Sequence, residues 1–404
     1  MDKKRFSQGY VGLIFFVMFI YGISNQAIGT LITRIITHYG IKMAEAGLLS
    51  SFANAGNFAA IFIVTFFTGR INKIILMGAS LFFYSASLYL ISTAPLFGIL
   101  LGSFALIGLF GATTDTLTNS LVADLLPNNI SRSMSFLHGI FGLGGLCGPI
   151  LIERFAGNRP SFGGESWAQV YFIISVAFFM YLLIYAVFVK WQWSILAVRL
   201  SHDKQAGFGF SDIVQFFGQK QCVLLWAAMF FYGGNQSTLS VWIKRYVETH
   251  LDAPAWGAYA LSAMWLGIAI SRLIVSPVIK ASSPKKICFG NFISAVALAA
   301  GLFSNSAPGI TAASLLVGLS SGLSIPLIIA MGCEWHREKT AFGALMPFTA
   351  CFIAYVVFPP LSGLVSDSLG IPWGVALGAA SAFLTAVFSG VLDMNLRIPG
   401  ALKQ

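Results

Sequence analysis

Along the chain, long apolar stretches alternate with short polar segments, and twelve such stretches can be counted. Each is close to 20 residues or longer, which lets a helix cross the hydrocarbon core of a bilayer. A helix also satisfies its backbone hydrogen bonds within the segment, as lipid surroundings require. The predicted spans are 10–32, 44–67, 73–92, 96–123, 133–155, 168–190, 221–243, 257–279, 287–305, 309–331, 341–365 and 372–392.

The longest polar interruption lies near the middle of the chain and separates six predicted spans from six. Membrane carriers often consist of two related halves. We therefore predict an N-terminal six-helix bundle over 1–191, a central cytoplasmic loop over 192–220 and a C-terminal six-helix bundle over 221–404. The expected fold class is an all-α membrane protein.

The composition supports this class, because 57% of the residues are hydrophobic and only 9% are charged. About a quarter of the residues of a soluble domain are charged. Most Lys and Arg residues fall in segments that are cytoplasmic if the N-terminus is cytoplasmic, as the positive-inside bias requires. We therefore predict that both termini are cytoplasmic, and we attribute the net charge of +10 to this bias rather than to nucleic-acid binding. The outside segments carry only Arg34, Lys42, Arg154, Arg159, Lys244 and Arg245.

Asp115 is the one acidic residue of the predicted span 96–123. A charge at the centre of a bilayer costs at least ~2.5 kcal/mol, so an acid kept there usually lines a cavity, pairs or carries protons. The alternative is a structural aspartate whose hydrogen bonds lock the helix. We favour a role in proton coupling. Asn119 lies four residues further on and is expected on the same helix face.

His138 follows early in the next span, after a short loop. At 1.5 Å per residue, folding about that loop is expected to bring it to the depth of Asn119, within reach of Asp115 directly or through one water. Histidine titrates near neutral pH. A proton relay between Asp115 and His138 and a histidine bonded to a backbone carbonyl are equally compatible with the sequence.

Two spans share a local pattern that suggests an internal repeat. The first span reads FIYGISNQAIGTLI and the seventh reads FFYGGNQSTLSVWI, and each has Tyr-Gly followed by Asn-Gln. The alternative is chance, since glycine and aromatic residues are common in both spans. The amide pairs Asn25/Gln26 and Asn235/Gln236 are expected to face each other across a central axis. Amides offer a donor and an acceptor together, which suits recognition of hydroxyl groups.

Five motifs occur in order along the chain: GATTDTLTNSLVADLLP, SFLHGIFGLGGLCGPIL, FYGGNQSTLSVWI, WLGIAISR and LVGLSSGLSIP. Together they resemble the fucose/proton symporter branch of the major facilitator superfamily, which includes bacterial glucose and mannose carriers. The resemblance implies twelve transmembrane helices in two six-helix bundles, and location in the bacterial inner membrane. It also implies a proton-coupled carrier, expected as a monomer, that imports a small neutral solute such as a monosaccharide or polyol. The sequence does not exclude sodium as the coupling ion.

Within this interpretation the residues receive the following expected roles. Proton coupling is assigned to Asp115 and His138. Solute binding is assigned to Asn25, Gln26, Asn119, Tyr232, Asn235, Gln236 and Trp265. Aromatic surfaces for a sugar ring are sought among Tyr21, Tyr232, Trp242, Trp265, Phe348 and Tyr355. Arg70 and Arg272 are assigned gating or structural charges. Arg272 is expected either to pair with a carboxylate or a helix C-terminus, or to extend its side chain so that the guanidinium reaches the cytoplasmic membrane surface.

The chain departs from the family pattern in three places. The segment TGRINKIILMG keeps Arg70 but lacks the aspartate that usually precedes the Gly-Arg pair, which puts the usual gating ion pair in doubt. The first span has no acid, and many relatives have glutamate at the position of Gln236. The fifth span also resembles the antiporter signature of drug-efflux members, so a proton-coupled efflux antiporter is the alternative function. Its small and helix-bending residues are Gly139, Gly142, Gly144, Gly145, Gly148 and Pro149.

The remaining motifs argue against other classes. The five cysteines have no metal-ligand spacing, and the chain has neither a phosphate-binding loop nor a serine nucleophile elbow. We therefore expect no disulfide, metal site, cofactor or enzymatic activity.

Overall fold

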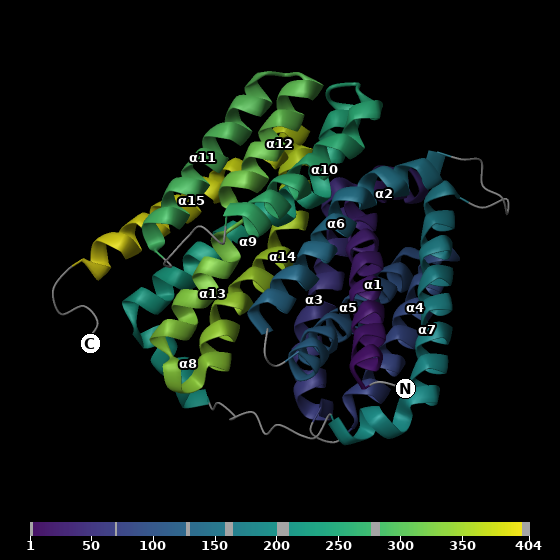
Figure 1. Ribbon diagram of the computed structural model, residues 1–404. Helices are drawn as coiled ribbons and strands as arrows, with labels where there is room; N and C mark the ends of the chain where they lie inside the picture. The colour runs from purple at the N-terminus through teal and green to yellow at the C-terminus, as the bar shows by residue number, and fades with distance from the viewer. Residues whose placement is uncertain are drawn as a thin grey trace. The chain divides into compact units, whose positions relative to one another are not determined.

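The structure is a computed structural model that describes residues 3–68, 71–126, 130–157, 165–199, 210–275 and 283–397. Every regular element within these ranges is a helix, which confirms the predicted all-helical class (Figure 1). By contacts the chain divides into two compact units. The N-terminal unit comprises 1–41 and 48–204, and the C-terminal unit comprises 42–47 and 205–404.

The first half of the chain contains seven helices among its described residues. They are α1 (Lys3–Ser24), α2 (Ala27–Tyr39), α3 (Met43–Thr68), α4 (Lys73–Ser92), α5 (Phe97–Leu125), α6 (Ile130–Gly157) and α7 (Ser166–Arg199). The described part of the second half contains α8 (Phe210–Gly218), α9 (Lys220–Thr249), α10 (Pro254–Ile270), η2 (Ser271–Val275), α11 (Pro284–Phe303), α12 (Ala307–Ser321), α13 (Ser324–Trp335), η4 (Arg337–Lys339), α14 (Thr340–Leu369) and α15 (Ile371–Leu396).

The segment 192–220 is more helical than the loop that we expected. The apolar run of α7 continues to Arg199, and a short helix with an apolar face, α8, precedes α9. Residues 200–209 lie outside the described ranges.

Eleven of the described spans are long and apolar enough to cross a membrane. Two of these spans, Gly9–Tyr39 and Ala307–Trp335, each consist of two helices separated by a short break. The remaining predicted span, 221–243, is the seventh along the chain and corresponds to α9, which has 30 residues. It is less apolar because glycines, amides and hydroxyls follow one another at its centre, from Gly233 to Thr238.

Glycines allow close helix contacts inside each unit. In the N-terminal unit α1 packs against α6, and α4 packs against α5 and α7 (Figure 1). A Cβ atom at Gly22 would clash with the backbone oxygen of Phe141, and one at Gly144 with that of Phe19. Small residues at such crossings let membrane helices approach closely. In the fifth predicted span, Gly144 therefore has a packing role against α1.

In the C-terminal unit α9 packs against α14 and α15, α10 packs against α12, and α11 packs against α12 and α15.

The regular α-helical backbone is interrupted at three places that matter for the site, one in the N-terminal unit and two in the C-terminal unit. The chain breaks at Asn25–Gln26 between α1 and α2, and at Gly322–Leu323 between α12 and α13. Helix α10 runs into a π-helical turn, η2. Broken helices and π-turns are frequent at functional sites.

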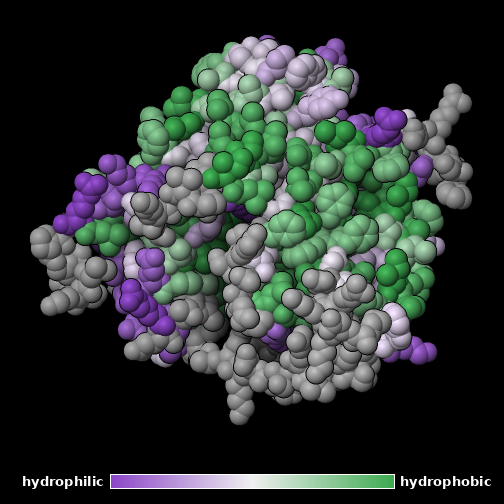
Figure 2. Space-filling view, in the orientation of Figure 1, coloured by the Kyte–Doolittle hydropathy of each residue, from purple (hydrophilic) through white to green (hydrophobic). Residues whose placement is uncertain are grey.

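Large apolar side chains remain exposed on the outside of the helices, for example Phe62, Val187 and Phe303. In the space-filling view apolar residues cover much of the visible face, and hydrophilic residues gather mainly near helix ends (Figure 2). A soluble monomer rarely exposes large contiguous apolar patches. The molecule is therefore a multi-pass membrane protein with lipid as its surroundings.

Candidate functional site

Each unit contains one cluster of polar side chains that come from several of its helices. The N-terminal cluster comprises Tyr21, Ser24, Asn25, Tyr84, Asp115, Asn119 and His138. The C-terminal cluster comprises Tyr232, Gln236, Arg272, Cys351 and Tyr355.

Asp115 and Asn119 form the centre of the N-terminal cluster on α5. The Asn119 side-chain amide donates to the Asp115 backbone carbonyl at 2.8 Å and to its Oδ1 at 3.1 Å. Both residues are partly buried. The four-residue spacing predicted this shared face. The amide fixes one carboxyl oxygen and leaves the other lone pairs of the carboxyl group for a proton or a further partner.

His138 on α6 interacts electrostatically with the Asp115 carboxyl group. Its side chain is exposed within the described part of the chain. The histidine was placed here by folding the sequence about a short loop, and the electrostatic interaction agrees with that placement. An exposed imidazole therefore lies within electrostatic range of the partly buried Asp115 carboxyl group.

Tyr21 of α1 joins the break between α1 and α2 to this acid. Its hydroxyl is hydrogen-bonded to the Asn25 side chain and interacts electrostatically with Asp115. Its ring lies 5.8 Å from that of Tyr84, whose hydroxyl is 2.8 Å from Ser24 Oγ. The cluster is therefore a continuous set of hydroxyls, amides and one carboxyl group from α1, α4, α5 and α6.

The two amides of the first Asn-Gln pair have different surroundings. Asn25 is exposed and contacts Tyr21, whereas Gln26 is 3% exposed and packs against Gly148 of α6. The Gln26 carbonyl also accepts a hydrogen bond from Thr30 at 2.7 Å. The Asn25 side chain is therefore accessible from outside the protein, whereas the Gln26 side chain packs between helices.

In the C-terminal unit, Tyr232 and Gln236 share a face of α9. The Tyr355 hydroxyl of α14 donates to Gln236 Oε1 at 2.7 Å. The Tyr355 hydroxyl is also hydrogen-bonded to the Cys351 side chain, one turn earlier on α14. These contacts join α9 to α14 through a tyrosine and an amide. The N-terminal cluster uses the same combination in Tyr21 and Asn25.

Arg272 lies in the π-helical turn η2 and points into the C-terminal unit. Its Nε donates to the Gly322 carbonyl at 3.2 Å, and its guanidinium is hydrogen-bonded to the Tyr232 hydroxyl. Gly322 is the C-cap of α12. The contact with a helix C-terminus, one of the alternatives for Arg272, is present in the structure.

Other residues predicted for the site have packing contacts. Asn235 is buried, and its amide donates to the Gly378 carbonyl of α15 at 2.9 Å. Trp242 is also buried and donates to the Pro359 carbonyl at 3.1 Å. Trp265 lies half-buried on α10. These three residues and Gln26 stay predictions as solute ligands, but Asn235 and Trp242 already use a donor in helix packing.

Arg70 lies outside the described residues. Beside that segment, Lys73 at the start of α4 pairs with Asp124 near the end of α5 at 2.8 Å. The missing aspartate of the family pattern therefore does not leave this end of the N-terminal unit without an ion pair.

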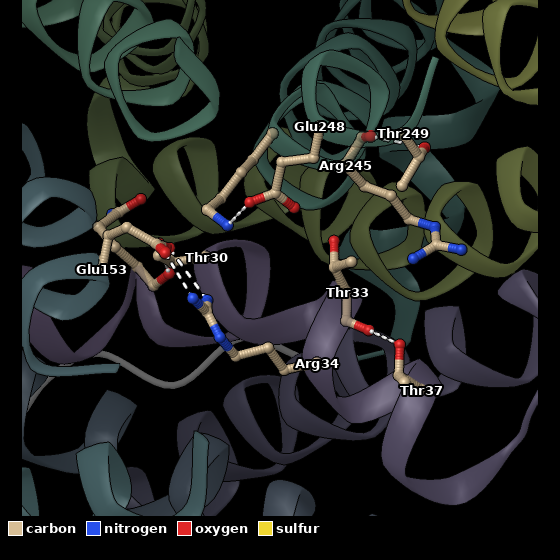
Figure 3. Close-up of polar contacts among 10 residues, drawn as sticks. Thr30, Thr33, Arg34, Thr37, Glu153, Arg245, Glu248 and Thr249 are labelled. Carbon is tan, nitrogen blue, oxygen red and sulfur yellow. Dashed lines mark hydrogen bonds and ion pairs between the residues drawn. The ribbon is translucent and has the colours of Figure 1, made fainter. Parts of the chain in front are cut away.

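Figure 3 shows one further ion pair in each unit. In the N-terminal unit, the Arg34 guanidinium of α2 forms a two-pronged contact with the Glu153 carboxylate of α6, at 2.5 and 3.0 Å. In the C-terminal unit, the buried Lys244 of α9 pairs with Glu248 one turn further on. The first pair ties the half-helix after the Asn25–Gln26 break to α6.

The sequence did not indicate Ser24, Tyr84 or Cys351. Ser24 adjoins the Asn-Gln pair, but serine and tyrosine are common in every span. In the described ranges, no group of three His, Cys, Asp or Glu side chains is arranged to hold a metal ion.

The comparisons with known proteins agree with a carrier fold. Residues 14–346 match the family model described as Major Facilitator Superfamily. A protein described as a TsgA homolog, from Buchnera aphidicola subsp. Baizongia pistaciae (strain Bp), is 23% identical over 282 residues, which are 68% of each chain.

Two solved structures share the fold. A bacterial homolog of the human lysosomal transporter Spinster, inward-facing and unoccupied, has a TM-score of 0.72 at 14% identity, and the match covers 97% of this chain and 96% of that one. The transporter FucP in its outward conformation has a TM-score of 0.59 at 16% identity, and the match covers 95% of this chain and 98% of that one. The family model spans most of the sequence, and the chain belongs to the Major Facilitator Superfamily.

Proposed function

We propose that the protein is a proton-coupled secondary transporter that imports a small hydroxylated solute of monosaccharide or polyol size by alternating access. The observation that carries this proposal is Asp115, a carboxyl group inside a membrane-spanning helix, held by Asn119 and facing His138. An ionisable residue in such a place marks a proton or substrate pathway by default. The sequence motifs that resemble the fucose/proton symporter branch support the solute class.

The proposed coupling follows from the chemistry of the carboxyl group. A protonated carboxyl group can donate one hydrogen bond and carries no charge, whereas the carboxylate only accepts. Protonation of Asp115 from outside removes a charge from the membrane interior and favours the loaded carrier. His138 is the group assigned to pass the proton on. Release of the solute inside is followed by release of the proton.

Recognition of hydroxyl groups is assigned to the tyrosine–amide pairs. Tyr21 with Asn25, and Tyr355 with Gln236, each combine a hydroxyl with an amide donor and acceptor. Such groups match a polyhydroxylated solute, and a site built on hydrogen bonds rejects analogues that lack the matching hydroxyl. The carrier is proposed to work as a monomer in the bacterial inner membrane with both termini cytoplasmic.

The test is uptake of labelled monosaccharides and polyols into cells that overproduce the protein, with and without a protonophore. We expect one solute to accumulate to a higher level than in control cells. We also expect the protonophore to abolish this accumulation. Accumulation that persists with the protonophore but is lost when sodium is omitted would identify sodium as the coupling ion instead of the proton. Proton-dependent extrusion of a dye, with no sugar uptake, would contradict import and favour the efflux antiporter.

A further inference from the structure

Arg272 is half-buried in the C-terminal unit, and its guanidinium carries a positive charge. Its guanidinium contacts the Gly322 carbonyl and the Tyr232 hydroxyl, and it acts electrostatically on Cys351 and Tyr355. These four partners are neutral groups. A guanidinium stays charged in proteins, so these contacts solvate the charge without neutralising it.

None of the ion pairs among the described residues includes Arg272. The described carboxylates on α9, α10, α12, α13 and α14 are Glu248, Glu334 and Asp367. Glu248 and Asp367 lie twelve residues beyond Gln236 and Tyr355 in α9 and α14, and Glu334 lies ten residues after the start of α13 at Ser324. Twelve residues of helix are about 18 Å long. The carboxylates of these helices are therefore remote from the guanidinium along the helix axes.

The end of α12 compensates the charge only in part. The C-terminus of a helix carries about half a negative charge, and Gly322 offers Arg272 one carbonyl there. A guanidinium has five N–H donors in a planar fork that matches a carboxylate with two parallel hydrogen bonds. The described hydrogen bonds of Arg272 go to Gly322, from Nε, and to Tyr232, and the five N–H donors of the guanidinium exceed these two contacts.

The neighbours of the guanidinium suit the rest of a hydroxylated anion. Gln236 and Tyr355 are hydrogen-bonded to each other and lie on the two helices that also carry Tyr232 and Cys351. Amide and phenol groups exchange hydrogen bonds with hydroxyls. A charged residue inside a membrane protein is commonly part of a substrate pathway. The cluster therefore combines one fixed cation with several neutral hydrogen-bonding groups.

We infer that the C-terminal cluster binds the carboxylate of the transported solute at Arg272, so that the solute is a sugar acid, a hydroxylated monocarboxylate of monosaccharide size. This inference rests on the proposed function for transport and coupling. It replaces the neutral solute expected from the sequence by its carboxylated counterpart. Gln236 and Tyr355 then serve the hydroxyls of the same molecule.

The test is binding of labelled D-gluconate to the purified full-length protein in detergent, with D-gluconamide and D-glucose as competitors. Gluconamide keeps the hydroxyls and removes the charge. We expect gluconate to bind, and both neutral competitors to be at least about tenfold weaker, the factor that corresponds to one charged hydrogen bond. If gluconamide competes as well as unlabelled gluconate, or if gluconate does not bind, the inference is overturned by measurements on the unmodified protein alone.

Three variants locate the binding charge. Arg272→Gln is expected to weaken gluconate at least about tenfold and to leave glucose unchanged, and Arg272→Lys to restore part of the loss because the charge returns without the fork. Arg397→Gln is the matched control, since Arg397 pairs with Asp393 near the end of α15. Equal weakening of both ligands by Arg272→Gln would make Arg272 a positioning residue for α12 and overturn the inference.

Uptake measured beside binding separates this inference from the proposed function. Glucose uptake driven by protons, with no binding of gluconate, leaves the proposed function intact and overturns the sugar-acid inference. Gluconate binding that depends on Arg272, with no proton-dependent uptake of any solute, supports the binding site and contradicts the proposed transport.

Discussion

Replacement of Asp115 by asparagine is expected to abolish concentrative uptake while leaving exchange of the solute across the membrane. Asparagine keeps the size of the side chain and its contact with Asn119, but it cannot carry a proton. A pH difference of about 1.7 units across the membrane supplies ~2.3 kcal/mol per transported proton, whatever the charge of the solute, and sustains roughly a fifty-fold concentration ratio. In the Asp115→Asn variant, the solute is expected to reach only equal concentrations on the two sides of the membrane.

Uptake into energised vesicles and counterflow in unenergised vesicles measure the two properties separately. Asp393→Asn is the matched control, because it removes an acid that pairs with Arg397 outside the cluster. It is expected to keep both activities. Loss of counterflow together with concentrative uptake in Asp115→Asn would mean that Asp115 binds the solute or holds the fold, and would contradict its role in coupling.

Replacement of Gly108 by alanine is expected to cause a large loss of stability for the addition of one methyl group. A Cβ atom at Gly108 of α5 would clash with the backbone oxygen of Ala53 on α3, and one at Gly56 with that of Ala105. The two helices therefore contact each other backbone to backbone, and neither oxygen can rotate away. Inserting a methyl group into a packed core costs about 1–3 kcal/mol.

Gly102→Ala on the same helix is the matched control, because a Cβ atom there would meet no atom within 4 Å. Alanine is favoured over glycine in a helix by about 1 kcal/mol, so this variant is expected to be neutral or more stable. Thermal unfolding in detergent compares the two variants. Equal melting temperatures for Gly108→Ala and the unmodified protein would contradict the tight contact between α3 and α5.

The helices were predictable because long apolar stretches have few alternatives in a membrane. The breaks within them were not. The patterns Tyr-Gly-Ile-Ser-Asn-Gln and Tyr-Gly-Gly-Asn-Gln look alike, yet the first ends a helix at Ser24 and the second continues within α9. In α9, Gly233 and Gly234 pack against Ala354 and Phe358 of α14. Such packing decides the local conformation more strongly than the residue types do.

The candidate site was predictable where it is local in sequence or where a short loop joins two helices, as for Asp115 and His138. Asp115 and Asn119 are four residues apart in one helix, so their contact follows from helix geometry. The contact between Ser24 and Tyr84 spans 60 residues, and that between Arg272 and Gly322 spans 50. Contacts of this kind depend on which helices pack together and on where a helix breaks, which the sequence pattern did not indicate.

The central claim is that a solute and a proton enter together through a carrier coupled by Asp115. The most direct measurement is the pH inside proteoliposomes, recorded with a trapped dye when the solute identified by uptake is added outside at clamped membrane potential. Acidification of the lumen in step with solute entry, absent in Asp115→Asn, is the predicted result. Alkalinisation of the lumen, or solute entry with no pH change, would contradict the claim.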